Sequence, residues 1–165
     1  MSGPLGQVRA EGGRIGLRFE RAYGARPEEI WAALTEAESI RRWLLAEAVL
    51  EPRVGGAFRL GWSGGEAAEG TVLAWEPPRL LEVEWADGDG RSVLRVEIAP
   101  SAGGAVLVLD HRDVPAGAAV SMGAGWDAHL TALGEALEGR EEIAERWSRR
   151  YEALRPRYDE LLSSP

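Results

Sequence analysis

The chain has 165 residues, a formal net charge of -8 and no cysteine, and its length suits one domain with its own hydrophobic core. The negative charge and the lack of a basic stripe argue against nucleic acid as a partner, and no apolar run is long enough to span a membrane. Without cysteine there is no disulfide framework, thiol nucleophile or thiolate metal site, and a cytoplasmic location is expected.

The missing residue types limit the chemistry further. All 19 basic residues are arginine, which excludes a Schiff-base lysine and the lysine of a phosphate-binding loop. The two histidines, His111 and His129, are the only candidates for an imidazole base or ligand. Ser63 lies in a Gly-x-Ser-x-Gly pattern, residues 61–65, but this pattern stands between two strand-like segments and not between a strand and a helix, so it does not favour a hydrolase.

The chain begins with a polar, glycine-rich stretch and continues with three predicted elements. We expect residues 1–13 to be a flexible tail. Residues 14–23 alternate apolar and polar side chains, which predicts a half-buried strand. Pro27 is typical of a first helical residue, and Thr35 followed by Glu38 is typical of a capping box. Two short helices are therefore predicted after the first strand.

Short strand-like segments separated by turn residues fill the middle of the chain. An edge strand is possible at residues 48–50, and five further strands are predicted at residues 57–62, 70–76, 80–85, 92–98 and 105–111. Strands at this spacing predict an antiparallel meander. One face of the last strand carries Leu107, Leu109 and His111, and we expect this face to point into the fold.

Residues 120–138 predict one long amphipathic helix. Its apolar side chains recur three or four residues apart on one stripe, at Met122, Trp126, Leu130, Leu133 and Leu137. His129 lies on the edge of this stripe and is predicted to be partly exposed. A helix with one apolar side must bury that side. Because strands dominate the preceding chain, we expect a curved sheet wrapped around this helix.

Residues 140–165 are predicted to be a helical extension. Its apolar side chains recur at helical spacing, at Ile143, Trp147, Tyr151, Leu154, Tyr158 and Leu161. Pro156 is expected to kink or break the helix. Val106 and Val108 lie on the outer face of the predicted sheet, where a solvated strand would carry polar residues. We therefore expect the extension to pack on that outer face, or on a second subunit of a homodimer.

Neither histidine has a suitable metal-ligating neighbour in the sequence. Asp110 points away from His111 on a strand, and Asp127 lies about 200° from His129 around a helix. We therefore predict no metal and no cofactor. His111 is interpreted first as a structural side chain with hydrogen-bonded partners, and a contact with a ligand is the alternative.

Four groups of residues, in this order along the chain, carry a resemblance to a known family. They are Pro27-x-x-Ile30-Trp31-x-Ala33-Leu34-Thr35-x-x-Glu38-x-Ile40-x-x-Trp43, then Pro77-Pro78-Arg79-Leu80-Leu81 with Trp85, then Gly103-Gly104 with Leu107-x-Leu109-x-His111, and Gly125-Trp126 with Leu130, Leu133 and Leu137. Together with the order of elements, they resemble the helix-grip fold of the START-like SRPBCC superfamily. Within it, the chain is similar to the activator of heat-shock-protein ATPase homologue family over residues 14–138.

The resemblance implies an α+β helix-grip domain over residues 14–139, with an apolar cavity between the long helix and the concave face of the sheet. It also implies a small apolar ligand that is lipid-, sterol- or polyketide-like. The residues expected to line this cavity are Trp43, Phe58, Leu60, Trp62, Val83, Trp85, Leu107, Leu109, His111, Trp126 and His129.

Two alternative functions follow from the same resemblance. One is a polyketide cyclase or dehydratase-like enzyme that would use His111. The other is a chaperone cofactor or another protein-interaction module that would use residues 140–165. Ligand binding without catalysis is the preferred prediction, and no catalytic residue is assigned to it.

Overall fold

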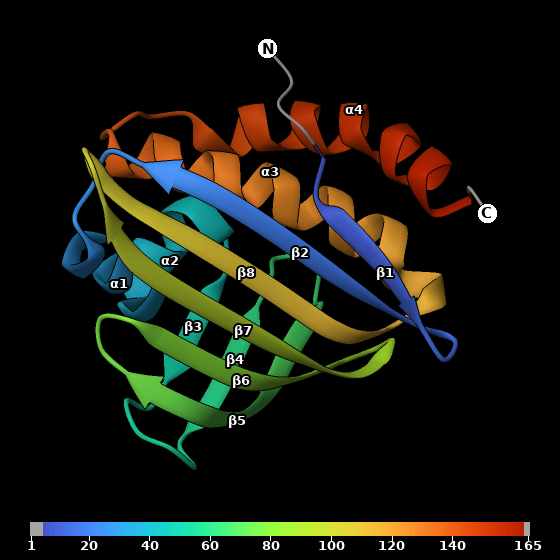
Figure 1. Ribbon diagram of the computed structural model, residues 1–165, viewed down its shortest axis with the longest axis horizontal. Coiled ribbons are helices and arrows are strands. Elements are labelled where there is room, and N and C mark those ends of the chain that lie inside the picture. Colours follow the sequence, from blue (N-terminus) through green and yellow to red (C-terminus); the bar gives the residue numbers. More distant parts are fainter. Residues whose placement is uncertain (1–4, 164–165) are drawn as a thin grey trace.

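The computed structural model describes residues 5–163. Eight antiparallel strands form one curved sheet in the order β1-β2-β8-β7-β6-β5-β4-β3, and the sheet wraps around a long helix, α3 (Figure 1). Pairing of β2 with β8 joins strands far apart in the sequence, and the other pairs join consecutive strands. The predicted α+β class and helix-grip arrangement are confirmed.

Apart from β1, the strands lie close to the predicted segments, and most are longer than predicted. Their bounds are β1 (Gln7–Glu11), β2 (Arg14–Tyr23), β3 (Glu47–Leu50), β4 (Ala57–Gly61), β5 (Ala67–Glu76), β6 (Leu80–Asp87), β7 (Gly90–Ser101) and β8 (Gly104–Pro115). Burial alternates along β8: Leu107, Leu109 and His111 are buried, whereas Val106 and Val108 are half-buried on the outer face. The last strand therefore presents the predicted face to the interior.

Strand β1 corrects the expected flexible tail over residues 1–13. It pairs with β2, and Val8 lies opposite Leu17. Gly12 and Gly13 have φ angles of 56° and 83°, which is the conformation that a two-residue hairpin turn requires. Gly12 and Gly13, which suggested a flexible tail in the sequence, therefore form the turn of the β1–β2 hairpin. Residues 1–4 of the expected tail lie outside the described residues.

Two short helices, α1 (Pro27–Thr35) and α2 (Ala37–Leu44), follow β2 as predicted. The expected capping box at Thr35 is wrong, because its hydroxyl donates to the Trp31 carbonyl at 2.8 Å inside α1. The Trp43 indole donates to the Ala33 carbonyl at 2.8 Å and thereby ties α2 to α1. The backbone turns at Leu45, which has a left-handed conformation, and the chain then enters β3.

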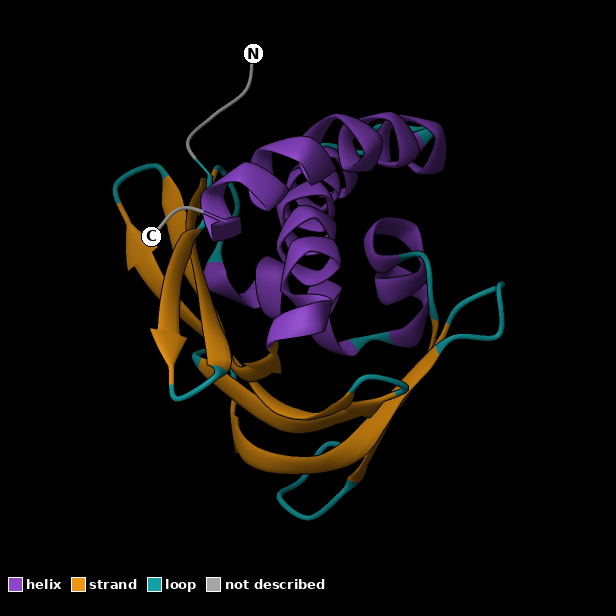
Figure 2. Cartoon of the chain, turned by 90° about the vertical axis from the view of Figure 1, so that its right-hand side faces the viewer, coloured by secondary structure: helices purple, strands orange, loops and turns teal. Residues whose placement is uncertain are grey.

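Helix α3 (Ala119–Leu137) follows a 3-10 turn, Ala116–Ala118, and lies within one residue of the prediction at each end. The concave sheet cradles it (Figure 2). Trp126, Leu130 and Leu133 are buried, but so are Ala124 and Ala128 on another side. Burial on two sides makes α3 the middle layer of the molecule, between the sheet and α4.

Helix α4 (Ile143–Ser163) runs along α3 on the side away from the sheet (Figure 1). The expectation that it covers the outer face of the sheet is therefore wrong. It continues through Pro156 without a break. Tyr158 is fully buried, and a Cβ atom added at Gly123 would lie 2.7 Å from its ring. The glycine thus allows the two helices to approach closely, and most of the apolar stripe of α4 packs within the chain, whereas Leu161 is exposed. The homodimer stays a prediction.

No helix within residues 5–163 is both long enough and apolar enough to cross a membrane.

Candidate functional site

A pocket of about 780 Å³ lies between α3, α4 and two turns of the sheet. We call it the open pocket. Residues 62 and 65–67, at the turn between β4 and β5, and residues 87–89, at the turn between β6 and β7, contribute from the sheet. Ser121, Met122 and Gly125 contribute from α3. Its volume falls within the range of roughly 300–1,000 Å³ that is typical of small-molecule sites.

Aromatic rings form one continuous wall of the open pocket. The Trp85 ring centroid lies 6.2 Å from that of Trp62 and 5.7 Å from that of Trp126. The His129 ring lies 6.2 Å from Trp126 and 4.8 Å from Trp147. Trp147 in turn stacks on the Tyr151 ring, with centroids 5.0 Å apart and planes 9° apart. Large flat rings in this arrangement suit a flat apolar molecule.

The charged side chains that line the open pocket are all acidic. They are Glu66, Asp87 and Asp89, and no basic side chain of residues 5–163 joins them. Asp87 is held in place, because it accepts hydrogen bonds from the Trp85 indole at 2.8 Å and from the Asp89 backbone N–H at 2.9 Å. The pocket therefore combines an apolar wall with a negative rim, which disfavours an anion.

A second cavity, which we call the small cavity, lies where the sequence predicted the ligand, between α2, α3 and the concave face of the sheet. Its volume is about 50 Å³ and its lining is almost entirely apolar. This is far below the roughly 300 Å³ at which small-molecule sites begin. The predicted residues that line it are Trp43, Phe58, Leu60, Val83, Leu107, Leu109 and Trp126. Their side chains largely fill the expected cavity, and most of this region is hydrophobic core.

The structure divides the predicted site residues between the two spaces. Trp62, Trp85, Trp126 and His129 line the open pocket, and Trp126 also lines the small cavity. The Trp126 ring is therefore a shared wall. His111 lines neither space.

His111 is fully buried and both of its ring nitrogens have partners. The Trp126 indole, which can only donate, donates to Nδ1 at 2.9 Å. In the neutral ring, Nε2 then carries the hydrogen and donates to the Ser92 hydroxyl at 2.7 Å. Burial lowers the pKa of His111 to about 4, against a smaller opposing effect of Asp87. This arrangement matches the interpretation of His111 as a structural side chain.

His129 is also buried, with 8% of its surface exposed, so the expectation of a partly exposed residue is wrong. Trp147 of α4 covers it. Its Nδ1 lies 3.0 Å from the Trp43 carbonyl oxygen, and because a carbonyl only accepts, Nδ1 carries the hydrogen. Burial lowers the pKa of His129 to about 4, partly opposed by this hydrogen bond. His129 is therefore neutral at pH 7, and its Nε2 is a hydrogen-bond acceptor.

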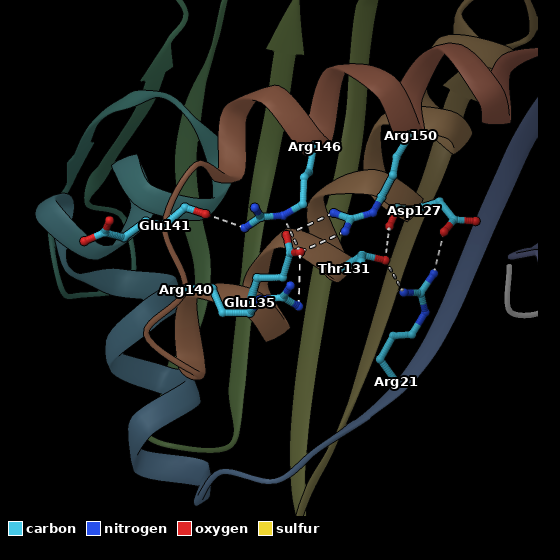
Figure 3. A network of polar contacts seen from close by, with 8 residues as sticks. All are labelled: Arg21, Asp127, Thr131, Glu135, Arg140, Glu141, Arg146 and Arg150. Carbon is cyan, nitrogen blue, oxygen red and sulfur yellow. Dashed lines mark hydrogen bonds and ion pairs between the residues drawn. The ribbon is translucent and has the colours of Figure 1, made fainter. Parts of the chain in front are cut away.

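Two polar contacts fix α4 over α3 and thereby position Trp147 and Tyr151. Glu135 of α3, almost fully buried, accepts hydrogen bonds from Arg146 at 2.8 Å and from Arg150 at 2.8 and 3.0 Å (Figure 3). The hydrogen bond from Arg150 is the main reason that the pKa of the Glu135 carboxyl lies below its usual value. Farther along α4, the Tyr158 hydroxyl donates to Asp127 at 2.6 Å.

Asp127 is in turn bound from the sheet. Arg21 of β2 donates to it at 2.7 Å and to the Thr131 hydroxyl at 3.3 Å (Figure 3). Within residues 5–163, no three histidine, aspartate or glutamate side chains gather in a way that could hold a metal ion.

Sequence reasoning missed the contributions of α4 and of the sheet turns. Trp147 and Tyr151 were assigned to an interaction surface, and Glu66, Asp87 and Asp89 were not assigned to the site. A signal for the helix contact was present, because Ala124, Ala128 and Ala132 recur every fourth residue of α3 and are all completely buried. Such a row of small residues allows another helix to pack closely.

Solved structures share this fold over most of the chain. CalU16 from Micromonospora echinospora is 28% identical, with a TM-score of 0.71, and the match covers 95% of each chain. Because the match covers 95% of this chain, it must include most of α4. A protein from Rhodobacter sphaeroides is 26% identical, with a TM-score of 0.70, over 83% of this chain and 100% of that one.

DynU16, from the dynemicin biosynthetic locus, has a TM-score of 0.68 at 21% identity, over 74% of this chain and 47% of that one. At this identity the likeness shows a shared fold alone. No curated protein matches the chain.

The family model described as Activator of Hsp90 ATPase homolog 1-like protein matches residues 24–138. This match begins just before α1 and ends one residue after α3, so it holds most of the sheet and leaves out α4. It confirms the resemblance drawn from the sequence motifs. The chain therefore belongs to the Activator of Hsp90 ATPase homolog 1-like family.

Proposed function

We propose that the protein binds a small, largely apolar molecule in the open pocket. The observation that carries the proposal is the pocket of about 780 Å³ with its wall of four indoles, one imidazole and one phenol ring. Core packing alone does not require such an opening, because side chains normally fill the interior. The family and its neighbours fit a ligand-binding role. The site differs from the predicted one, since the interior cavity is too small to hold such a molecule.

A tryptophan placed inside the pocket tests this proposal. Ser121 is an exposed α3 residue that lines the pocket, and Ser148 is an exposed α4 residue that does not. Native mass spectrometry of the purified protein should reveal a stoichiometric extra mass that denaturation releases. Ser121→Trp should lose this mass, and the matched control Ser148→Trp should keep it.

Equal retention of the extra mass by both variants would place the ligand outside the open pocket. A protein that carries no extra mass and takes up no naphthalene-sized molecule at millimolar concentration would contradict the proposed function altogether.

We do not extend the proposal to a cyclase or dehydratase activity through His111. A base must present a ring nitrogen to the reacting molecule, whereas both nitrogens of His111 are bonded to protein groups. We also do not extend the proposal to a protein-interaction role through residues 140–165, because Ile143, Leu154 and Tyr158 of the α4 stripe are buried within the chain.

A further inference from the structure

His129 holds an unused hydrogen-bond acceptor at the open pocket. Its Nδ1 is bonded to the Trp43 carbonyl, and Nε2 has no hydrogen-bond partner among residues 5–163. Within the same residues, the indole nitrogen of Trp147 is the one completely buried polar side-chain atom without a partner. The unpartnered Nε2 is therefore not sealed in the protein, and it is reached from the pocket that its ring lines.

The surroundings of Nε2 define what can bind to it. His129 is buried, with 8% of its surface exposed, and its ring lies among the rings of Trp43, Trp126 and Trp147. A neutral imidazole in such a place accepts a hydrogen bond and donates none through Nε2. A molecule that fills the pocket without a donor leaves this nitrogen unsatisfied, which costs binding free energy.

The charge of the rim adds a second restriction. Glu66, Asp87 and Asp89 line the pocket without a basic side chain among the described residues. A carboxylate or phosphate on the ligand would face these groups with no counter-charge, and like charges brought together oppose binding.

Building on the function proposed above, we propose that the ligand is a flat aromatic molecule that carries a hydroxyl or N–H donor and no negative charge, and that His129 Nε2 accepts its hydrogen bond. His129 is then the residue that determines specificity. The aromatic wall supplies most of the affinity, and the imidazole selects among molecules of similar shape.

Three naphthalenes of similar size test the proposal on the full chain at pH 7. They are 2-naphthol with a neutral donor, 2-methylnaphthalene without a donor, and 2-naphthoate with a negative charge. Affinities are measured by chemical-shift titration of the tryptophan indole N–H signals. We expect 2-naphthol to bind about three- to tenfold more tightly than 2-methylnaphthalene, the range of one net hydrogen bond. We expect 2-naphthoate to bind most weakly.

Two sets of variants separate the hydrogen bond from the charge. His129→Phe should bring the affinity of 2-naphthol down to that of 2-methylnaphthalene and leave the latter nearly unchanged. Glu66→Gln combined with Asp89→Asn should raise the affinity of 2-naphthoate alone, since neither side chain makes a hydrogen bond or ion pair within the described part of the chain.

A measurement on the unaltered protein covers the case in which His129→Phe does not fold. The nitrogen-15 resonance of His129 Nε2 should move upfield when 2-naphthol binds, as expected for an unprotonated nitrogen that accepts a hydrogen bond, and should not do so with 2-methylnaphthalene. Equal binding of all three naphthalenes with no such movement would overturn the specificity and leave the pocket function intact. Failure of all three to bind, in a protein that also carries no extra mass, would overturn both.

Discussion

The two histidines are alike in burial and differ in what their nitrogens meet. His111 receives a hydrogen bond from Trp126 and donates one to Ser92, so its hydrogen-bonding capacity is used within the protein. His129 uses one nitrogen on the Trp43 carbonyl and leaves the other at the pocket. The sequence favoured His111 as the functional histidine because a strand face fixes its direction. The sequence could not show that Ser92 of β7 and Trp126 of α3 form hydrogen bonds with both ring nitrogens of His111.

The acid sensitivity of the protein should follow from these histidines. Each has a pKa of about 4 in the folded chain and about 6.5 when unfolded. Between these values the unfolded chain binds more protons, so the stability present above pH 6.5 is lost as pH falls toward 4. The full loss is up to about 3 kcal/mol for each histidine. Urea unfolding at pH 7.5, 5.5 and 4.5 should show this decline.

The variant His129→Gln gives the control for this prediction. It keeps a donor for the Trp43 carbonyl but does not titrate, so the decline over the same pH range should be about half as steep. The carboxyl of Glu135, whose pKa is lowered in the folded chain, is present in both proteins and therefore affects both in the same way. Identical slopes in the two proteins would contradict the assignment.

At the scale of elements, α3 contacts a different partner on each of two sides. Its side toward the sheet carries large residues such as Trp126 and Leu130, and its side toward α4 carries glycine and alanine. Two glycines on this helix are two residues apart and have opposite surroundings. A Cβ atom at Gly123 would press into the Tyr158 ring, whereas a Cβ at Gly125 would meet nothing within 4 Å.

Alanine substitutions at these glycines should therefore have effects of opposite sign. Gly125→Ala should stabilise the protein by about 0.5–1 kcal/mol, since alanine is the better helix former. Gly123→Ala should destabilise it by about 1–3 kcal/mol, because overpacking displaces Tyr158. Thermal unfolding of the two variants beside the parent checks the pair. A stabilised Gly123→Ala variant would mean that α4 does not pack closely on α3.

The spacing of apolar residues predicted the bounds and the buried faces of single elements. It did not predict which distant parts of the chain contact each other. The ends of α3 and the inward face of β8 followed from spacing, because each depends on residues within one element. The position of α4 did not follow, since its apolar stripe is compatible with any apolar partner. Strand β1 was missed because a glycine pair is as typical of a tail as of a hairpin turn.

The sequence analysis named some of the residues that line the open pocket, but it did not predict where that pocket lies. Trp62, Trp85, Trp126 and His129 do line the open pocket. The remaining predicted residues fill the interior, because side-chain volumes and not side-chain directions decide whether a cavity is open. The acidic rim lies at the turns between β4 and β5 and between β6 and β7, whose positions depend on the register of the strands that they connect.

At the scale of the whole molecule, one hydroxyl group connects three distant segments. The Tyr158 hydroxyl of α4 accepts a hydrogen bond from the Gly6 backbone N–H at 2.8 Å and donates one to Asp127 of α3 at 2.6 Å. Burial and then the hydrogen bond to Asp127 raise the pKa of Tyr158, so the group stays protonated at pH 7. The segment before β1, α3 and α4 are thereby held together.

Removal of that hydroxyl should loosen both ends of the chain at once. Tyr158→Phe should lower the free energy of unfolding by about 1.5–3 kcal/mol, the range for a hydrogen bond to a charged group. Amide hydrogen exchange should accelerate over residues 5–11 and 143–163 together. Tyr151→Phe is the matched control, since the Tyr151 hydroxyl makes no hydrogen bond within residues 5–163. Faster exchange in one segment only would show that the hydroxyl does not couple them.

The aromatic wall also has an optical consequence. The ring centroids lie 6.2 Å apart for Trp62 and Trp85 and 5.7 Å apart for Trp85 and Trp126. At these distances, excitation energy absorbed by one indole can transfer to the next before fluorescence is emitted. A molecule that touches any of these rings should therefore quench emission from the group, not from a single tryptophan. Intrinsic fluorescence thus offers a label-free signal for occupation of the pocket.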